Sequence, residues 1–165
     1  MEKTVNSWSE LQKAIQEKID ETLQDEVANT VKKQISESAS NIVYKAYEPT
    51  IYWRRKYTDR GLADEEIMNS NLVSSGELVV TNDAPFNPKN IDGTHEPEGE
   101  EPEHEKGITN MNKSLAYNIE YGWGSRSESY SKPRPFMSNA KEHLRNGKAR
   151  EALKKGLRKR GLDAQ

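Results

Sequence analysis

The sequence contains no cysteine. This absence excludes disulfide scaffolds, thiolate metal sites and cysteine redox chemistry, and it fits a reducing compartment. No segment approaches the roughly 20 consecutive apolar residues that a membrane-spanning helix needs. The first residues also lead into no apolar run of the kind found in signal peptides. We therefore expect a soluble, non-redox protein of the cytoplasm or of a particle assembled there, without a membrane partner.

Hydrophobic residues are also scarce. They make up 32% of the 165 residues, against roughly 45–50% in ordinary globular domains, and the mean hydropathy is −1.05. The length fits one domain, which we place at residues 1–165. Its core should be thin, unless part of the chain stays extended or another subunit completes the packing.

Charge is distributed unevenly along the chain, although the formal net charge is only −2. Residues 91–112 carry 7 acidic side chains and 1 basic side chain, whereas residues 113–165 carry 13 basic and 5 acidic side chains. The sequence therefore predicts an acidic insert followed by a basic C-terminal third.

A long helix, or two abutting helices, is predicted from Ser7 or Ser9 to about Tyr47. Ser7 and Glu10 have the spacing of a capping box. Apolar residues then recur at every fourth position, so in an ideal helix their stripe drifts by about 40° at each step. The helix should therefore bend or break, with Asn29-Thr30 as its weakest point, or pack its two halves on different neighbours. The stripe consists of Leu11, Ile15, Ile19, Leu23, Val27, Val31, Ile35 and Ala39.

Two readings of this stripe remain open: a curved helix packed on its own domain, or an N-terminal half packed on another subunit. The second reading accounts better for the small core.

After Pro49, which ends the helix, the aromatic-rich residues 51–57 form a strand or an extended docking segment. Residues 65–73 and 77–81 are predicted to form a β-hairpin.

The acidic insert, at about residues 84–112, is predicted to be a long loop because it has little apolar content and several prolines. Its carboxylates include Glu96, Glu98, Glu100, Glu101, Glu103 and Glu105. Structure should resume at residues 115–122 as a short helix or strand. A C-terminal helix should follow with Pro135 as its first residue, a possible dent at Gly147 and a cap at Gly161. These elements predict an α+β fold.

Catalytic chemistry has little support in the residues. The sequence has no glycine-flanked serine elbow and no phosphate-binding glycine loop. Two of the three histidines, His95 and His104, lie among the carboxylates of the insert, and the third is His143. A metal site needs rigid support around its ligands, so a solvated loop is the better interpretation. We expect no enzymatic activity, no metal and no cofactor.

The basic C-terminal helix has two interpretations. It could bind phosphates through its lysines and arginines, or it could be a solvated face at the favourable end of the helix dipole. It lacks the interleaved aromatic residues of a single-strand stacking platform. Arg54 and Arg55 likewise fit either an interface anchor or a charge-protected edge strand.

Several short motifs are similar to those of the head–tail joining proteins of tailed bacteriophages, which form the neck or complete the tail and are often described as minor capsid proteins. The motifs are a Tyr117…Glu120-Tyr121-Gly122 element, a Gly/Ser loop, and Arg134-Pro135-Phe136-Met137 followed by an alanine in a C-terminal helix. The upstream half, with its long helix, Arg54-Arg55 and a hairpin, also resembles this family. The likeness spans roughly residues 8–160, and the acidic insert is its least typical part.

This resemblance implies a ring-forming α+β subunit, expected as a hexamer, in the virion neck between the head and the tail. Such a ring is assembled in the bacterial host cytoplasm, contacts neighbouring neck proteins and the tail terminator or tube, and lets genomic DNA pass without sequence-specific binding. By the same resemblance, Glu120-Tyr121-Gly122 and Arg134-Pro135-Phe136 fix the core and the ring interface, and Arg54 and Arg55 lie at a subunit contact. The acidic loop is expected to face the channel or a neighbouring ring.

Two alternatives remain. One is a tail terminator that caps the tail tube. The other, from a different class, is a small cytoplasmic nucleic-acid-binding module that uses the basic C-terminal helix.

Overall fold

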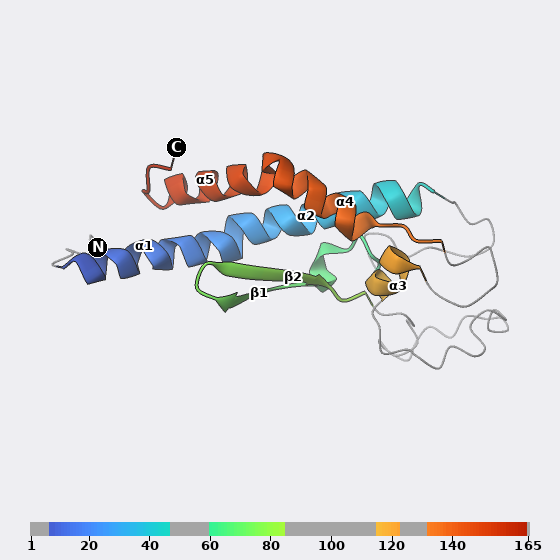
Figure 1. Cartoon of the computed structure of the whole chain (residues 1–165), viewed down its shortest axis with the longest axis horizontal. Coiled ribbons are helices and arrows are strands. Elements are labelled where there is room, and N and C mark those ends of the chain that lie inside the picture. The colour runs from blue at the N-terminus through green and yellow to red at the C-terminus, as the bar shows by residue number, and fades with distance from the viewer. Residues whose placement is uncertain (1–6, 47–59, 85–114, 123–131, 165) are drawn as a thin grey trace.

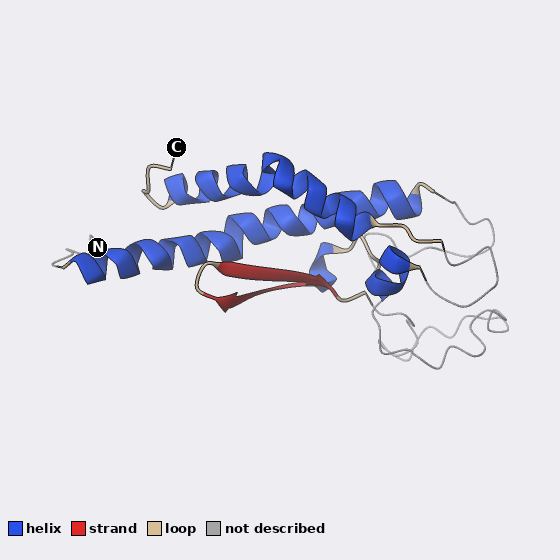
Figure 2. Ribbon diagram, in the orientation of Figure 1, coloured by secondary structure: helices blue, strands red, loops and turns tan. Residues whose placement is uncertain are grey.

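The computed structural model describes residues 7–46, 60–84, 115–122 and 132–164, and these residues form an α+β fold (Figures 1 and 2). A long N-terminal helix runs along the molecule, with a two-stranded antiparallel sheet on one side and the C-terminal helices on the other. Residues 85–112 of the acidic insert, Arg54 and Arg55 lie outside the described residues.

The long helix is continuous from Trp8 to Tyr44. It consists of α1 (Trp8–Thr22), a π-helical turn (Leu23–Val27), α2 (Ala28–Ser38) and a second π-helical segment (Ala39–Tyr44). The predicted N-terminal cap is confirmed, because the Ser7 hydroxyl oxygen accepts the Glu10 backbone N–H at 3.2 Å.

The predicted weak point at Asn29-Thr30 is wrong, because both residues are α-helical. The π-helical turn lies just before them and closes its hydrogen bonds from i to i+5. Each residue of such a turn therefore advances less than about 100° around the axis. This smaller advance counters the drift of the four-residue spacing, so the helix keeps much of its apolar stripe directed at the rest of the domain without breaking.

Both halves of the long helix pack on elements of their own domain, and packing of the N-terminal half on another subunit stays a prediction. α1 and the π-helical turn after it lie along α5 (Ala149–Lys159), whereas α2 packs mainly on α4 (Phe136–His143) (Figure 1). The two-stranded sheet contacts both the π-helical turn and α2. Gly156 of α5 makes the close approach possible, since a Cβ built on it would lie 2.3 Å from Thr22 Cγ2.

The predicted hairpin is confirmed, with β1 (Met68–Ser74) pairing antiparallel to β2 (Glu77–Asn82). Its first strand begins later than the sequence suggested, because Glu65–Ile67 form a 3-10 turn. Gly76 at the tip has a φ of +80°, a conformation that favours glycine.

The hairpin tip is fastened to the long helix by Asp20. Its carboxylate accepts the Gly76 backbone N–H at 2.8 Å and the Ser75 hydroxyl at 3.0 Å. The hydrogen bond from the Gln16 side chain contributes most to holding the pKa of Asp20 below its ordinary value, and the bonds from Gly76 and Ser75 lower this pKa further. An isolated two-stranded hairpin is marginally stable in water, so this attachment helps to fix the sheet on the helix.

The C-terminal part begins with α3 (Leu115–Tyr121) and continues, beyond residues 123–131, through α4, a π-helical segment (Leu144–Lys148) and α5. The predicted dent is confirmed, because Gly147 has a φ of +119° and kinks the chain between α4 and α5. Gly161 ends α5 as predicted, with the two hydrogen bonds of a Schellman motif, from Gly161 to Arg158 and from Leu162 to Leu157.

The core lies where α2, the start of β1, α3 and α4 meet, and it is small. Phe136 and Met68 are its largest fully buried side chains. Its buried members are Ile35, Ala39, Val43, Leu62, Ala63, Met68, Ala84, Ala116, Phe136 and Ala140. The thin core expected from composition is thus confirmed for the described residues.

Candidate functional site

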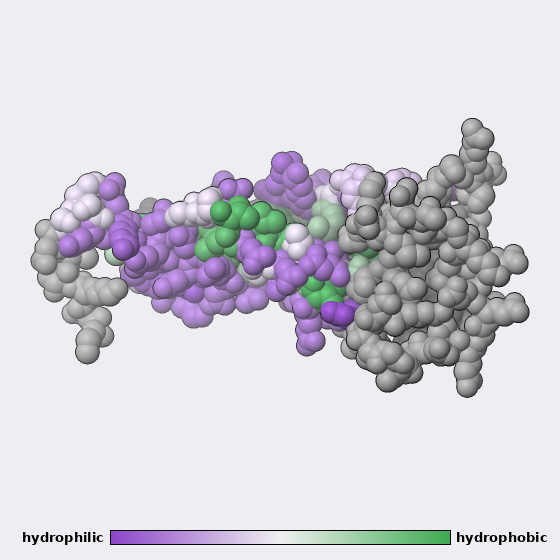
Figure 3. Space-filling view, turned by 90° about the horizontal axis from the view of Figure 1, so that it is seen from below, coloured by the Kyte–Doolittle hydropathy of each residue, from purple (hydrophilic) through white to green (hydrophobic). Residues whose placement is uncertain are grey.

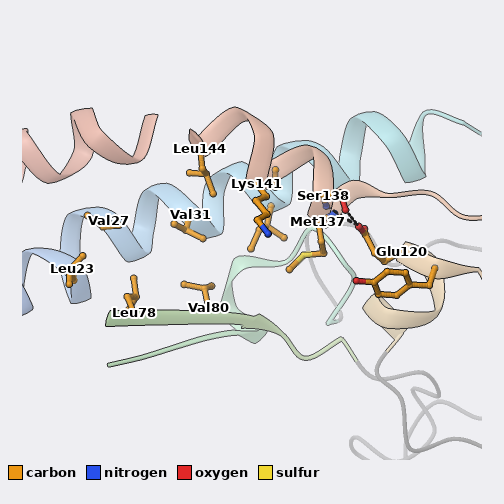
Figure 4. A pocket seen from close by; sticks show the side chains of 13 residues that line it. Leu23, Val27, Val31, Leu78, Val80, Glu120, Met137, Ser138, Lys141 and Leu144 are labelled. Carbon is orange, nitrogen blue, oxygen red and sulfur yellow. Dashed lines mark hydrogen bonds between the residues drawn. The ribbon is translucent and has the colours of Figure 1, made fainter. Parts of the chain in front are cut away.

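Glu120 connects the Glu-Tyr-Gly motif, to which it belongs, with the Arg-Pro-Phe-Met motif. Its side chain is only 5% exposed, and its carboxylate reaches the first turn of α4 (Figure 4). One oxygen accepts the Met137 backbone N–H at 2.8 Å, and the other accepts the Ser138 N–H at 2.9 Å and the Ser138 hydroxyl. A carboxylate from α3 therefore caps the N-terminus of α4 and complements its dipole.

This remote cap is needed because the chain supplies no local one. Pro135 lies at the N-cap position and forms no side-chain cap, so the prediction that it is the first helical residue is wrong by one position. It has φ −76° and ψ 66°, and the Phe136 N–H donates to the Arg134 carbonyl at 2.8 Å. This inverse γ-turn directs Phe136 into the core, where it is fully buried.

A second backbone link joins the two motifs, since the Arg134 N–H donates to the Ile119 carbonyl at 2.8 Å. Gly122 ends α3 with a φ of +76°, which explains the glycine at this position. Through Glu120 and Arg134 the structure thus joins α3 to the start of α4. The role of the motif residues at a ring interface stays a prediction.

The two tyrosines of the motif lie at the surface. Tyr121 is 65% exposed and Tyr117 is 44% exposed. Their ring centroids are 4.8 Å apart and the rings are tilted by 49°, a geometry typical of favourable aromatic pairs. Tyr121 lies at the edge of an open groove, so this pair marks one end of an apolar surface.

That surface is an open apolar groove of about 450 Å³ (Figure 4). Its floor is the long helix, one wall is β2, and the other wall is α4 with the segment after it. On the face seen in Figure 3, hydrophobic surface lies around the middle of the described chain. The apolar side chains that line the groove are Leu23, Val27, Val31, Ile35, Leu78, Val80, Met137, Ala140 and Leu144.

Two charged side chains, Glu120 and Lys141, also line the groove. The Glu120 carboxylate is occupied by the cap of α4, while Lys141 forms no ion pair with any residue that the structure describes. The groove is therefore an apolar surface with one positive charge at its wall.

A cluster of ion pairs joins the long helix to the C-terminal end of α5. Arg160 contacts Asp25 at 3.2 Å and is bonded to Glu26, while Lys159 contacts Glu26 at 3.1 Å. Burial alone raises the pKa of Glu26, but the hydrogen bonds from Arg160 and Lys159 outweigh it and lower this pKa. The same bond to Glu26 raises the pKa of Arg160. Part of the basic surface of α5 is thus neutralised within the chain.

The described residues offer no assembled metal site, since no three of their His, Asp or Glu side chains are grouped as ligands. Of the histidines, His143 is exposed at the end of α4, and His95 and His104 lie outside the described ranges. Within these ranges, no helix is long and apolar enough to span a membrane.

The groove was not predicted from the sequence, because Leu78 and Val80 show only the alternation of apolar positions that is typical of a strand. The contact between Gly156 and Thr22 and the cluster around Glu26 were not predicted either. The alternating strand pattern shows which face is apolar, but no sequence signal reveals that the C-terminal helices leave this face partly uncovered.

The chain belongs to the YomN family, whose family model matches residues 7–159. A curated relative, the SPbeta prophage-derived uncharacterized protein YomN of Bacillus subtilis (strain 168), is 29% identical over 120 residues. The matched region covers 73% of this chain and 68% of the relative. No solved structure matches the chain. The two matches indicate a phage-derived protein. They agree with the phage origin that the resemblance of the motifs implied.

Proposed function

We propose that this chain is a structural protein of the phage virion neck. Its subunits form a ring, expected as a hexamer, that joins the DNA-filled head to the tail and leaves a channel for DNA. The role is mechanical, without catalysis or a cofactor. Neighbouring neck proteins bind on the head side, and the tail terminator or tail tube binds on the other side.

The apolar groove is the observation that carries this proposal. It is open in the single subunit and is lined by side chains of the long helix, β2 and α4. Soluble monomers rarely leave large apolar patches exposed, whereas a subunit of a ring uses different surfaces to contact its two neighbours. A neighbouring subunit that fills the groove also compensates for the small core.

The linked motifs give the second line of support. Glu120, Arg134 and the γ-turn at Pro135 fasten α3 to α4, so the exposed tyrosines of α3 keep a fixed position beside the groove. Rigid aromatic side chains are typical of binding hot spots. Origin from a phage is consistent with this assignment, because a virion neck is one of the assemblies that phage genes encode.

The acidic loop has a proposed role in the channel or against a neighbouring ring. Carboxylates along a channel would repel the phosphate backbone and let the DNA slide. Arg54 and Arg55 are assigned to a subunit contact on the strength of the family resemblance alone.

Complementation tests the proposal directly. Extracts of a phage lacking the gene are expected to contain full heads and complete but separate tails, and the purified chain should join them. Overlong tails in the same micrographs would instead support the alternative of a tail terminator. Wild-type particle morphology without the gene would contradict both assignments.

The nucleic-acid-binding module remains a second candidate because α5 and α4 carry many basic residues. The ion pairs of Lys159 and Arg160 with the long helix weigh against it, since they use part of that charge internally. Discrete rings in negative stain favour the neck protein, whereas a monomer or dimer with steeply salt-dependent DNA affinity favours the module.

A further inference from the structure

The first turns of α1 carry an apolar stripe that the described part of the chain leaves largely uncovered. Trp8, Leu11 and Ile15 follow the i, i+3, i+7 spacing and therefore share one face of the helix. Trp8 is 72% exposed and Leu11 is 36% exposed, while Ile15 is half-buried. An exposed tryptophan at the end of such a stripe is a typical anchor for a binding partner.

The same face of the long helix meets α5 farther along, where Thr22 packs against Gly156. α5 ends near Lys18, whose Nζ donates to the Arg160 carbonyl at 2.6 Å. The N-terminal end of α1 extends past this point (Figure 1). Trp8 and Leu11 thus continue the apolar face beyond the end of the helix that covers it.

This stripe cannot enter the groove of its own subunit. Leu23, Val27 and Val31 form the groove floor and belong to the same continuous helix as Trp8. A helix cannot fold back onto its own side without breaking, and the described helix is unbroken from Trp8 to Tyr44. The Trp8 stripe can therefore enter only the groove of another copy of the chain.

The two surfaces match in chemistry. An amphipathic helix that presents anchors at i, i+3 and i+7 is a recurring ligand of apolar grooves. α1 carries four acidic and two basic side chains, whereas α4 and the segment after it, which form one groove wall, carry three basic and one acidic. Opposite net charges favour the encounter of these two surfaces.

We propose that the Trp8–Leu11–Ile15 stripe of one subunit docks in the apolar groove of the next subunit. The contact joins two different surfaces, so it is heterologous and its repetition closes a ring or extends a filament. This inference rests on the ring-forming part of the proposed function and specifies which surfaces make the ring.

Cross-linking tests the contact. Because the chain has no native cysteine, only the introduced thiols can react with a maleimide. A chain with Leu11→Cys and Leu78→Cys has one thiol on the stripe and one in the groove. A short bismaleimide should link it into a ladder of several subunits on a denaturing gel. The matched control carries Lys13→Cys and Val79→Cys, whose side chains lie on the opposite faces of the same elements, and should remain monomeric.

Mixing experiments test the polarity of the contact. A chain with only Leu11→Cys and a chain with only Leu78→Cys should yield cross-linked dimers when mixed and no higher products. Independently, Leu11→Asp should reduce the assembly seen by native mass spectrometry to monomers, because it places a charge on the stripe. Since Leu11 is at the surface, the circular dichroism spectrum should not change.

The outcomes separate this inference from the proposed function. Rings that survive Leu11→Asp, or equal cross-linking of the control pair, overturn the inference while the neck assignment stands. A Leu78→Cys thiol that is unreactive in diluted monomers shows that the same chain covers the groove, which also overturns it. A wild-type chain that is monomeric at every concentration, and fails to join heads to tails, overturns both.

Discussion

Glu120 and Ser138 are 18 residues apart in the chain, yet the Glu120 carboxylate accepts both the backbone N–H and the hydroxyl of Ser138. These bonds place a buried carboxylate at the positive end of α4. They also explain why a glutamate and an Arg-Pro-Phe-Met motif occur together in one chain: Pro135 offers no side-chain cap, and Glu120 takes over that role. The pair ties α3 to α4 at the edge of the groove.

The first prediction concerns this cap. Glu120→Ala should lower the free energy of unfolding by about 0.5–2 kcal/mol, because the Met137 and Ser138 N–H groups lose their acceptors at the partly buried start of α4. Glu120→Gln should cost less, since its amide retains one acceptor oxygen. Urea denaturation monitored by circular dichroism measures both effects.

Glu142→Gln is the matched control for this prediction. Glu142 lies exposed on the same helix, away from its first turn, so its replacement should change stability by less than about 0.5 kcal/mol. Equal losses for Glu120→Ala and Glu142→Gln would contradict the capping role.

The second prediction concerns the contact between α5 and the long helix. In Gly156→Ala the new methyl group would lie 2.3 Å from Thr22 Cγ2 and 2.8 Å from a Glu26 carboxylate oxygen, so these side chains or the helices must shift. We expect a loss of about 1–3 kcal/mol from overpacking, although alanine is intrinsically better in a helix by about 1 kcal/mol. Thermal and urea unfolding measure the change.

Thr22→Ser provides the control, because it removes the Cγ2 atom and keeps the hydroxyl that donates to the Lys18 carbonyl. In a double-mutant cycle, Gly156→Ala should cost clearly less in the Thr22→Ser background than in the wild type. Additive losses would mean that the two positions do not clash.

Local sequence signals predicted much of the fold. Ser7 and Glu10 gave the start of the long helix, and Gly161 gave the end of the last one, because capping depends on a few neighbouring residues. The hairpin also followed from its strand pattern and Gly76. The π-helical turn at Leu23–Val27 did not, because it depends on how the long helix packs on α5 and the sheet.

The candidate site was predicted only in part. The motif residues around Glu120 and Phe136 are close together, as the resemblance implied, but their spacing gave no indication that a carboxylate would cap α4. The groove depends on the relative placement of β2, α4 and the long helix, which are distant in the sequence. Such tertiary placement leaves no periodic signal in any one segment.

The third prediction concerns pH. The pKa of Glu26 is lower in the folded protein than its ordinary value of 4.5, so the native state favours its ionised form. Its contribution to stability is therefore fully present above about pH 4.5 and is lost as the pH falls through the lower folded pKa. Glu26→Gln should reduce the unfolding free energy by about 1 kcal/mol at neutral pH, and the difference from wild type should shrink in acid.

Glu151→Gln is the control for this titration, since Glu151 is exposed on α5 and forms no ion pair with the described residues. Its stability difference from wild type should stay near zero between neutral and acidic pH. A Glu26→Gln difference that is constant across this range would mean that the ion pair does not contribute through charge.

The fourth prediction concerns the basic surface of α5. Lys159 and Arg160 are paired with the long helix, so part of the positive charge of this surface is already neutralised within the chain. We expect weak binding to a fluorescent DNA duplex, with a shallow dependence on salt between roughly 50 and 200 mM. Lys154→Gln combined with Lys155→Gln should weaken this residual binding further and leave the joining of heads to tails unchanged. Tight, steeply salt-dependent binding that the double variant abolishes would instead favour the nucleic-acid-binding module, because only such a module needs these charges for its activity.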